Sequence, residues 1–187
     1  MSPSSPPHHT VRRRSFGRCQ TPTLCLLLLQ LADAQPSIEE LHAALKAQPE
    51  SPAAHNNLGL AFKAQGRLEV AIPLFNKAIE LDPGYARGYN NLGNAMQSLG
   101  EVAVAAGHFR TATELLPTMA SGFINLGSAL RALERPEDAA HALSRALELN
   151  PLSDAAHTNL GAVAQESSSR DNLRALAMSS REHVAPF

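Results

Sequence analysis

The sequence has little of the chemistry on which disulfide-rich or nucleic-acid-binding proteins depend. Its 187 residues include two cysteines, no tryptophan and 4% aromatic residues, and the formal net charge at pH 7 is −1. The two cysteines, Cys19 and Cys25, do not make a disulfide framework. A net charge near zero gives no overall attraction to nucleic acid or to anionic lipid. We therefore expect no nucleic-acid partner.

Motifs for catalysis and for metal binding are also missing. The chain has no glycine-rich phosphate loop and no nucleophile elbow. None of its eight histidines is paired at the i, i+4 spacing of a helical zinc site. The apolar run from Leu24 to Leu31 is too short to cross a bilayer, since a spanning helix needs about 20 residues. We expect a non-enzymatic chain with no cofactor, no metal and no membrane span.

What the sequence does contain is a repeat with a period of 34 residues. The stretch HNNLGLAFKAQGRLEVAIPLFNKAIELDP, residues 55–83, returns in varied form at 89–117 and at 123–151, and a fourth copy begins at His157. All four copies have a Leu-Gly pair, and the first three also have two small residues on either side of a bulky apolar one and a closing proline. The Leu-Gly pairs are Leu58-Gly59, Leu92-Gly93, Leu126-Gly127 and Leu160-Gly161.

Each copy is predicted to form two helices. Apolar and small residues recur at steps of three and four, as on one face of a helix, and a short polar turn such as Gln65-Gly66-Arg67 interrupts them. Pro83 follows the last apolar residue of the second helix, where a helix ends. A hairpin of this kind cannot bury its apolar face alone, so neighbouring copies must stack.

The period and these positions resemble the tetratricopeptide repeat (TPR), and among its members the repeats of O-linked N-acetylglucosamine transferases. The resemblance implies an all-α, right-handed solenoid of antiparallel helix pairs. The predicted array, residues 35–166, consists of a partial repeat 35–51, full repeats 52–85, 86–119 and 120–153, and a half repeat 154–166.

Two interpretations of residues 1–34 stay open. The segment is rich in Pro, Ser and Arg, and its basic region, apolar run and Ala32-Asp33-Ala34 have the layout of a cleaved signal peptide. Alternatively, the segment is disordered up to residue 23, and Leu24, Cys25 and Leu28 belong to a degenerate first helix whose partner helix is Ile38 to Ala47. We favour a cytoplasmic location; a cleaved segment would instead indicate export or an organelle.

Residues 167–187 depart from the repeat and are predicted to form a divergent C-terminal cap or tail. Ser167, Ser168 and Ser169 would cap a short helix from Arg170 to Met178. Such a segment could cover the end of the solenoid.

Asparagines precede the four Leu-Gly pairs and are the main candidates for a binding site. In the transferases that this repeat resembles, such a ladder holds the backbone of an extended peptide, and an amide offers both a donor and an acceptor for that purpose. The alternative is that these asparagines only bond to neighbouring turns and hold the repeats at their spacing. The predicted peptide-binding residues are Asn57, Asn91, Asn125 and Asn159, with Asn56, Asn90, Asn94, Lys63, Gln97 and Arg131 beside them on the first helices.

These observations predict an adaptor that binds a protein or an extended peptide in the groove of the solenoid. The two-carboxylate clamp known in the family is not expected, because Asn56, Ser121 and Asn125 stand where it needs Lys and Arg. One alternative is the substrate-recruiting arm of a glycosyltransferase-type enzyme whose catalytic domain is absent from this chain. A purely structural role, by self-association through the imperfect ends, is a third.

Overall fold

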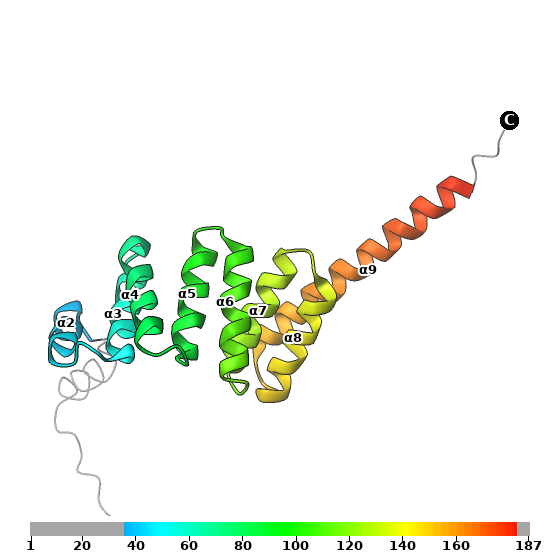
Figure 1. The fold of residues 1–187 in the computed structure, drawn as a ribbon. Coiled ribbons are helices and arrows are strands. Elements are labelled where there is room, and N and C mark those ends of the chain that lie inside the picture. Colours follow the sequence, from blue (N-terminus) through cyan, green and yellow to red (C-terminus); the bar gives the residue numbers. More distant parts are fainter. Residues whose placement is uncertain (1–35, 183–187) are drawn as a thin grey trace, which may run out of the picture. The chain divides into compact units, whose positions relative to one another are not determined.

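A computed structural model describes the backbone of residues 36–182 and the side chains up to residue 169. Both interpretations of residues 1–34 concern a segment outside this range. Within it the chain forms eight helices and no strand (Figure 1). The helices are α2 (Ile38–Ala47), α3 (Pro52–Ala64), α4 (Leu68–Leu81), α5 (Ala86–Ser98), α6 (Val102–Leu115), α7 (Ala120–Ala132), α8 (Pro136–Leu149) and α9 (Asp154–Glu182).

The helices pair as hairpins in chain order, α3 with α4, α5 with α6, and α7 with α8. Their first helices begin at Pro52, Ala86 and Ala120, and α9 begins at Asp154, so each start is 34 residues from the last. The result is the all-α solenoid of helix pairs that the repeat predicts.

The core lies where the repeated small and bulky positions meet. The second helices contribute fully buried side chains at every repeat of these positions: Ala71, Ala105, Ala139, Phe75, Phe109, Leu143, Ala78, Ala112 and Ala146. In the three full repeats the glycine of the Leu-Gly pair makes room for the bulky residue: a Cβ at Gly93, for example, would lie 2.6 Å from Cε1 of Phe109. Burial of these apolar surfaces is the main favourable contribution to folding.

The turns inside the hairpins require a left-handed backbone. Gly66 and Gly100 have φ values of 76° and 84°, and Glu134 occupies the same place in the third repeat with φ 59°. Pro136 then begins α8, where its missing N–H costs no helical hydrogen bond. Pro73 and Gly107, two poor helix formers at equivalent positions of the first two full repeats, lie at exposed positions of α4 and α6.

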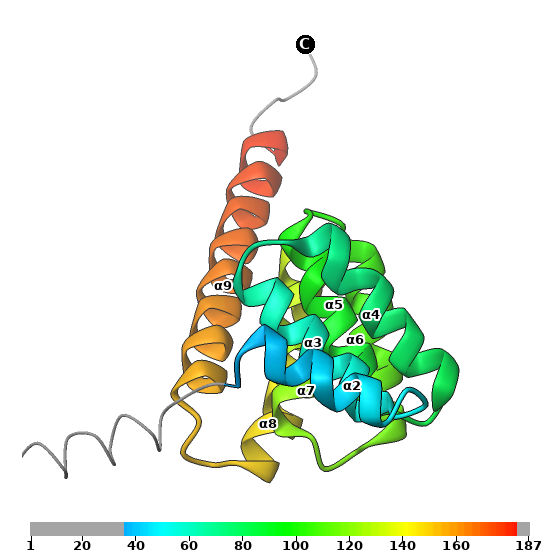
Figure 2. The same cartoon turned by 90° about the vertical axis from the view of Figure 1, so that its left-hand side faces the viewer.

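The contacts between helices show which surface is concave. The first helices of successive repeats touch one another (α3 with α5, α5 with α7, α7 with α9), whereas within residues 36–182 the second helices α4, α6 and α8 make no such contacts. The first helices therefore line the inner side of the array. Figure 2 views the described array from the end at which α2 lies.

The two ends of the described array differ. At the start, Ser37 and Glu40 form a capping box on α2: the Glu40 N–H donates to Oγ of Ser37 at 3.2 Å. At the other end α9 is one continuous helix, so the separate helix predicted after Ser167–Ser169 is wrong. Ser169 does not cap; its hydroxyl donates to the Gln165 carbonyl at 2.9 Å, the back-bonding by which serine is accommodated inside a helix.

None of the helices described is both long and apolar enough to cross a membrane.

Candidate functional site

A polar cavity of about 490 Å³ opens on the inner side of the array, between the first helices. It extends from α3 across α5 to the start of α7 and includes the turns before α5 and α7. Its lining residues are Asn56, Asn57, Leu60, Tyr85, Arg87, Asn90, Asn91, Leu116, Thr118, Met119 and Ser121. Four asparagines predicted from the sequence therefore meet in one place.

These asparagines are connected by hydrogen bonds that run from one repeat to the next. Nδ2 of Asn91 donates to Oδ1 of Asn56 at 2.7 Å, and Nδ2 of Asn125 donates to Oδ1 of Asn90 at 3.0 Å. Nδ2 of Asn56 in turn lies 3.5 Å from Oδ1 of Asn57, at the long limit for a hydrogen bond. Asn91 and Asn125 are thus each tied to the preceding repeat.

Burial separates the two kinds of asparagine. Asn56 and Asn90 have 3% and 9% of their surface exposed, so they need partners inside the protein. Asn91 and Asn125 are half-buried and Asn57 is exposed. The buried residues are the acceptors and the half-buried ones the donors. We call Asn57, Asn91, Asn125 and Asn159 the ladder, and Asn56 and Asn90 the supporting asparagines.

The pattern stops after the third repeat. The position that holds a supporting asparagine in the first two repeats is occupied there by Ile124, and Asn159 makes no side-chain hydrogen bond to any described residue. The side-chain hydrogen bond between α7 and α9 is made instead by Arg131, whose Nη1 donates to Oε1 of Glu166 at 2.9 Å. Arg131, a predicted groove residue, is therefore engaged within the protein.

The remaining predicted residues do not reach this cavity. Asn94, Lys63 and Gln97 are on first helices but are absent from its lining, as are Asn125, Asn159 and Arg131. The residues that the sequence analysis missed are Leu60, Tyr85, Arg87, Leu116, Thr118 and Met119; Ser121 was considered only for the clamp. Arg87 had a usable signal, because it lies four residues, about one helical turn, before Asn91.

Arg87 is the only charged residue in the lining, and no described carboxylate lies within ion-pairing distance of it. Burial raises the pKa of Tyr85; the positive charge of Arg87 opposes this shift and Asp82 adds to it. The phenol therefore stays protonated at neutral pH and can donate a hydrogen bond. The cavity offers amides, the hydroxyls of Tyr85, Thr118 and Ser121, and one guanidinium, with Leu60, Leu116 and Met119 as apolar contacts.

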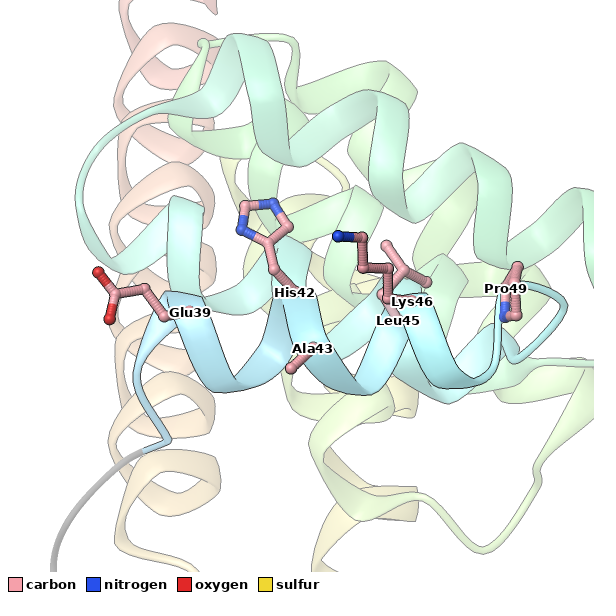
Figure 3. Close-up of a pocket in the computed structure, with 6 residues that line it drawn as sticks. All are labelled: Glu39, His42, Ala43, Leu45, Lys46 and Pro49. Carbon is pink, nitrogen blue, oxygen red and sulfur yellow. The ribbon is translucent and has the colours of Figure 1, made fainter.

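A second cavity, of about 710 Å³, lies along α2 (Figure 3). Among the described residues, those that line it are Glu39, His42, Ala43, Leu45 and Lys46 of α2 and Pro49 of the following turn. None of these lining residues is an asparagine of the ladder. The cavity between the first helices is accordingly the stronger candidate for a site built by the repeats.

Within the described part of the chain, no group of three or more His, Cys, Asp or Glu side chains is placed to hold a metal ion.

Comparison with protein families identifies the repeat. Residues 24–86 and 124–167 match a family model for the tetratricopeptide repeat, and residues 74–103 match a second model of the same description. The first model alone covers more than half of the chain. Its match begins at residue 24, inside the segment for which the sequence leaves both a repeat helix and a cleaved signal open. No curated protein sequence matches the chain.

Solved structures show the same arrangement of helices. YrrB, a TPR protein with an unusual peptide-binding site, is 26% identical with a TM-score of 0.65, over 73% of this chain and 70% of YrrB. The first TPR domain of human RPAP3 is 27% identical with a TM-score of 0.63, over 66% of this chain and 98% of that domain. The first TPR of Spaghetti (RPAP3), bound to the HSP90 peptide SRMEEVD, is 25% identical with a TM-score of 0.62, over 63% and 94% respectively.

Proposed function

Because this chain belongs to the tetratricopeptide repeat family, we propose that it is a non-catalytic adaptor that binds an extended peptide of another protein on the inner side of its array. The observation that carries the proposal is the row of side-chain amides on α3, α5 and α7, of which Asn57 and Asn91 line the cavity. An extended peptide has unpaired N–H and C=O groups along its backbone, and regularly placed amides can bind both.

The similar structures support the proposal. YrrB has a peptide-binding site, and the Spaghetti domain binds a peptide that ends in EEVD. In the present chain the positive charge of the cavity is limited to Arg87, which favours a ligand with one carboxylate at that point. Leu60, Leu116 and Met119 would contact an apolar side chain beside it.

The test is selection of peptides from a random dodecapeptide library on the wild-type protein, followed by affinity measurements on variants. If the ladder holds the peptide, Asn91→Ala combined with Asn125→Ala weakens binding while circular dichroism shows an unchanged helix content. Asn76→Ala on the second helix α4 is a matched control, since Asn76 is exposed and does not line the cavity. Equal binding by the double variant and by the control would place the site elsewhere.

Two other outcomes would indicate different functions. Co-purification with an active glycosyltransferase would favour the role of a substrate-recruiting arm. A molecular mass that rises with protein concentration, with no peptide selected, would favour self-association.

A further inference from the structure

The supporting asparagines carry an inference about how the groove binds, and it rests on the proposed function. We propose that Asn56 and Asn90 are positioning residues, which orient the ladder amides of Asn91 and Asn125 so that their carbonyl oxygens are presented to the N–H groups of the peptide backbone. The bonds concerned are the 2.7 Å bond from Asn91 to Asn56 and the 3.0 Å bond from Asn125 to Asn90.

The chemistry of an amide makes this orientation consequential. A free asparagine can rotate its amide by half a turn, which exchanges the NH₂ group and the oxygen at nearly equal energy. Oδ1 of Asn56 can only accept, so it selects the orientation of Asn91 in which the NH₂ group faces the preceding repeat. The oxygen of Asn91 must then point away from that bond, and no described protein group donates to it.

Among the described residues, the supporting asparagines have no other hydrogen-bond donor to replace the ladder amide. Asn56 and Asn90 are almost fully buried, so their oxygens would lose a hydrogen bond without regaining one from water if the ladder amide turned. The ladder amides are half-buried and can still be reached from the groove. Part of the entropy of ordering the binding groups is therefore lost on folding instead of on binding, which strengthens binding.

The third full repeat lacks a supporting asparagine. Ile124 replaces the supporting asparagine beside Asn159, and Asn159 has no side-chain bond to a described residue. The oriented part of the ladder accordingly ends at Asn125. A bound peptide would donate its backbone N–H groups to Asn91 and Asn125, and Asn159 would contribute little.

The natural difference between repeats supplies the test. Asn90→Ile gives the second repeat the residue that the third already has, and Asn90→Asp keeps an acceptor oxygen for Asn125. The probe is the tightest dodecapeptide selected by the wild-type protein, fluorescently labelled, with affinity measured by anisotropy. Asn90→Ile is expected to weaken binding about tenfold, the effect of one hydrogen bond, and Asn90→Asp to restore most of it.

A double-mutant cycle separates positioning from a general loss of structure. If Asn90 acts through Asn125, adding Asn90→Ile to Asn125→Ala causes no further loss of affinity, whereas independent effects would multiply. Should Asn90→Ile fold poorly in thermal melts, Asn56→Ile provides the same experiment at Asn91. The NMR signals of the Asn125 side-chain amide provide a readout without ligand: in the wild type they exchange slowly with water, and in Asn90→Ile they exchange faster.

The outcomes distinguish this proposal from the proposed function. Loss of binding in Asn125→Ala together with wild-type binding in folded Asn90→Ile would overturn positioning and leave the peptide groove intact. Equal losses in Asn90→Ile and Asn90→Asp would also overturn it, because the acceptor would then be irrelevant. If the wild-type protein selects no peptide, both proposals fail.

Discussion

Nδ2 of Asn91 donates to Oδ1 of Asn56 at 2.7 Å, across the boundary between the first two full repeats. The two residues are 35 positions apart, one more than the period of the repeat, and Asn125 and Asn90 repeat the relationship at 3.0 Å. The bond therefore joins inner helices of successive repeats, α3 with α5 and α5 with α7, and adds a polar connection to the apolar packing.

Removing the donor should lower stability where the acceptor is buried. We expect Asn91→Ala to reduce the free energy of unfolding by about 1–2 kcal/mol, since Oδ1 of Asn56 is left in the interior without its partner. Asn159→Ala is the matched control and should change it by less than about 0.5 kcal/mol, as for a surface substitution. Urea denaturation followed by circular dichroism measures both, and equal values for the two variants would contradict the expectation.

Replacing the glycine of a Leu-Gly pair by alanine should destabilise the protein only where a second helix packs against that glycine. A Cβ at Gly127 would lie 2.6 Å from Cγ of Leu143 and 3.2 Å from the Ala139 carbonyl oxygen, whereas one at Gly161 meets nothing within 4 Å. Gly127→Ala is expected to destabilise the protein by about 1–3 kcal/mol through overpacking. Gly161→Ala is expected to stabilise it by about 0.5–1 kcal/mol through helix propensity. Thermal melts of the two variants should move in opposite directions.

Glu134 holds a conformation that the other repeats assign to glycine. Its φ of 59° costs a residue with a Cβ roughly 1 kcal/mol, a penalty that Gly66 and Gly100 avoid. Glu134→Gly should therefore raise the free energy of unfolding by about 1 kcal/mol, and Gly100→Ala should lower it by about the same amount. The backbone N–H of residue 134, which donates to the Arg131 carbonyl at 3.0 Å, is retained in the glycine variant. If Glu134→Gly is less stable than the wild type, the side-chain contacts of Glu134 contribute more to stability than its positive φ costs.

His108 should make stability depend on pH in the mildly acidic range. Burial lowers its pKa in the folded protein, so below the ordinary histidine value of about 6.5 the unfolded chain binds a proton more readily than the folded one. The stabilisation is present above that value and is lost as the pH falls toward the folded pKa. Unfolding of the wild type and of His108→Gln at pH 7.5 and pH 5.5 should show a smaller loss in the variant; identical losses would contradict the assignment.

Much of the fold can be predicted from the sequence because each repeat carries the same pattern of core positions. Ala71, Phe75 and Ala78 return in kind at intervals of 34 residues, and all of these positions are fully buried. The end of the array was harder to predict, since a serine can either cap the start of a helix or, inside a helix, donate its hydroxyl to the carbonyl of the preceding turn. Ser169 does the latter, and only the continuous path of α9 shows it.

The candidate site was predictable only in part. The ladder and supporting asparagines are visible as a repeated pair before Leu-Gly, but the direction of their bonds depends on which amide is buried, and no local pattern expresses that. Leu116 and Met119 come from the turn between repeats, so their place in the cavity depends on how α7 packs against α5. Arg131 shares the helix face of a groove residue, yet Glu166, 35 residues later, engages it.

Ile124 affects the register in which a peptide would bind along the groove. If every repeat carried the same groups, a bound peptide displaced by one repeat would make the same contacts again. Its binding energy would then be equal in every register. In this array a shift toward α9 replaces an oriented asparagine with Asn159 and moves the ligand away from Arg87. If the groove binds a peptide as proposed, positions displaced by one repeat therefore differ in binding energy, and one register is favoured although the sequence is almost periodic.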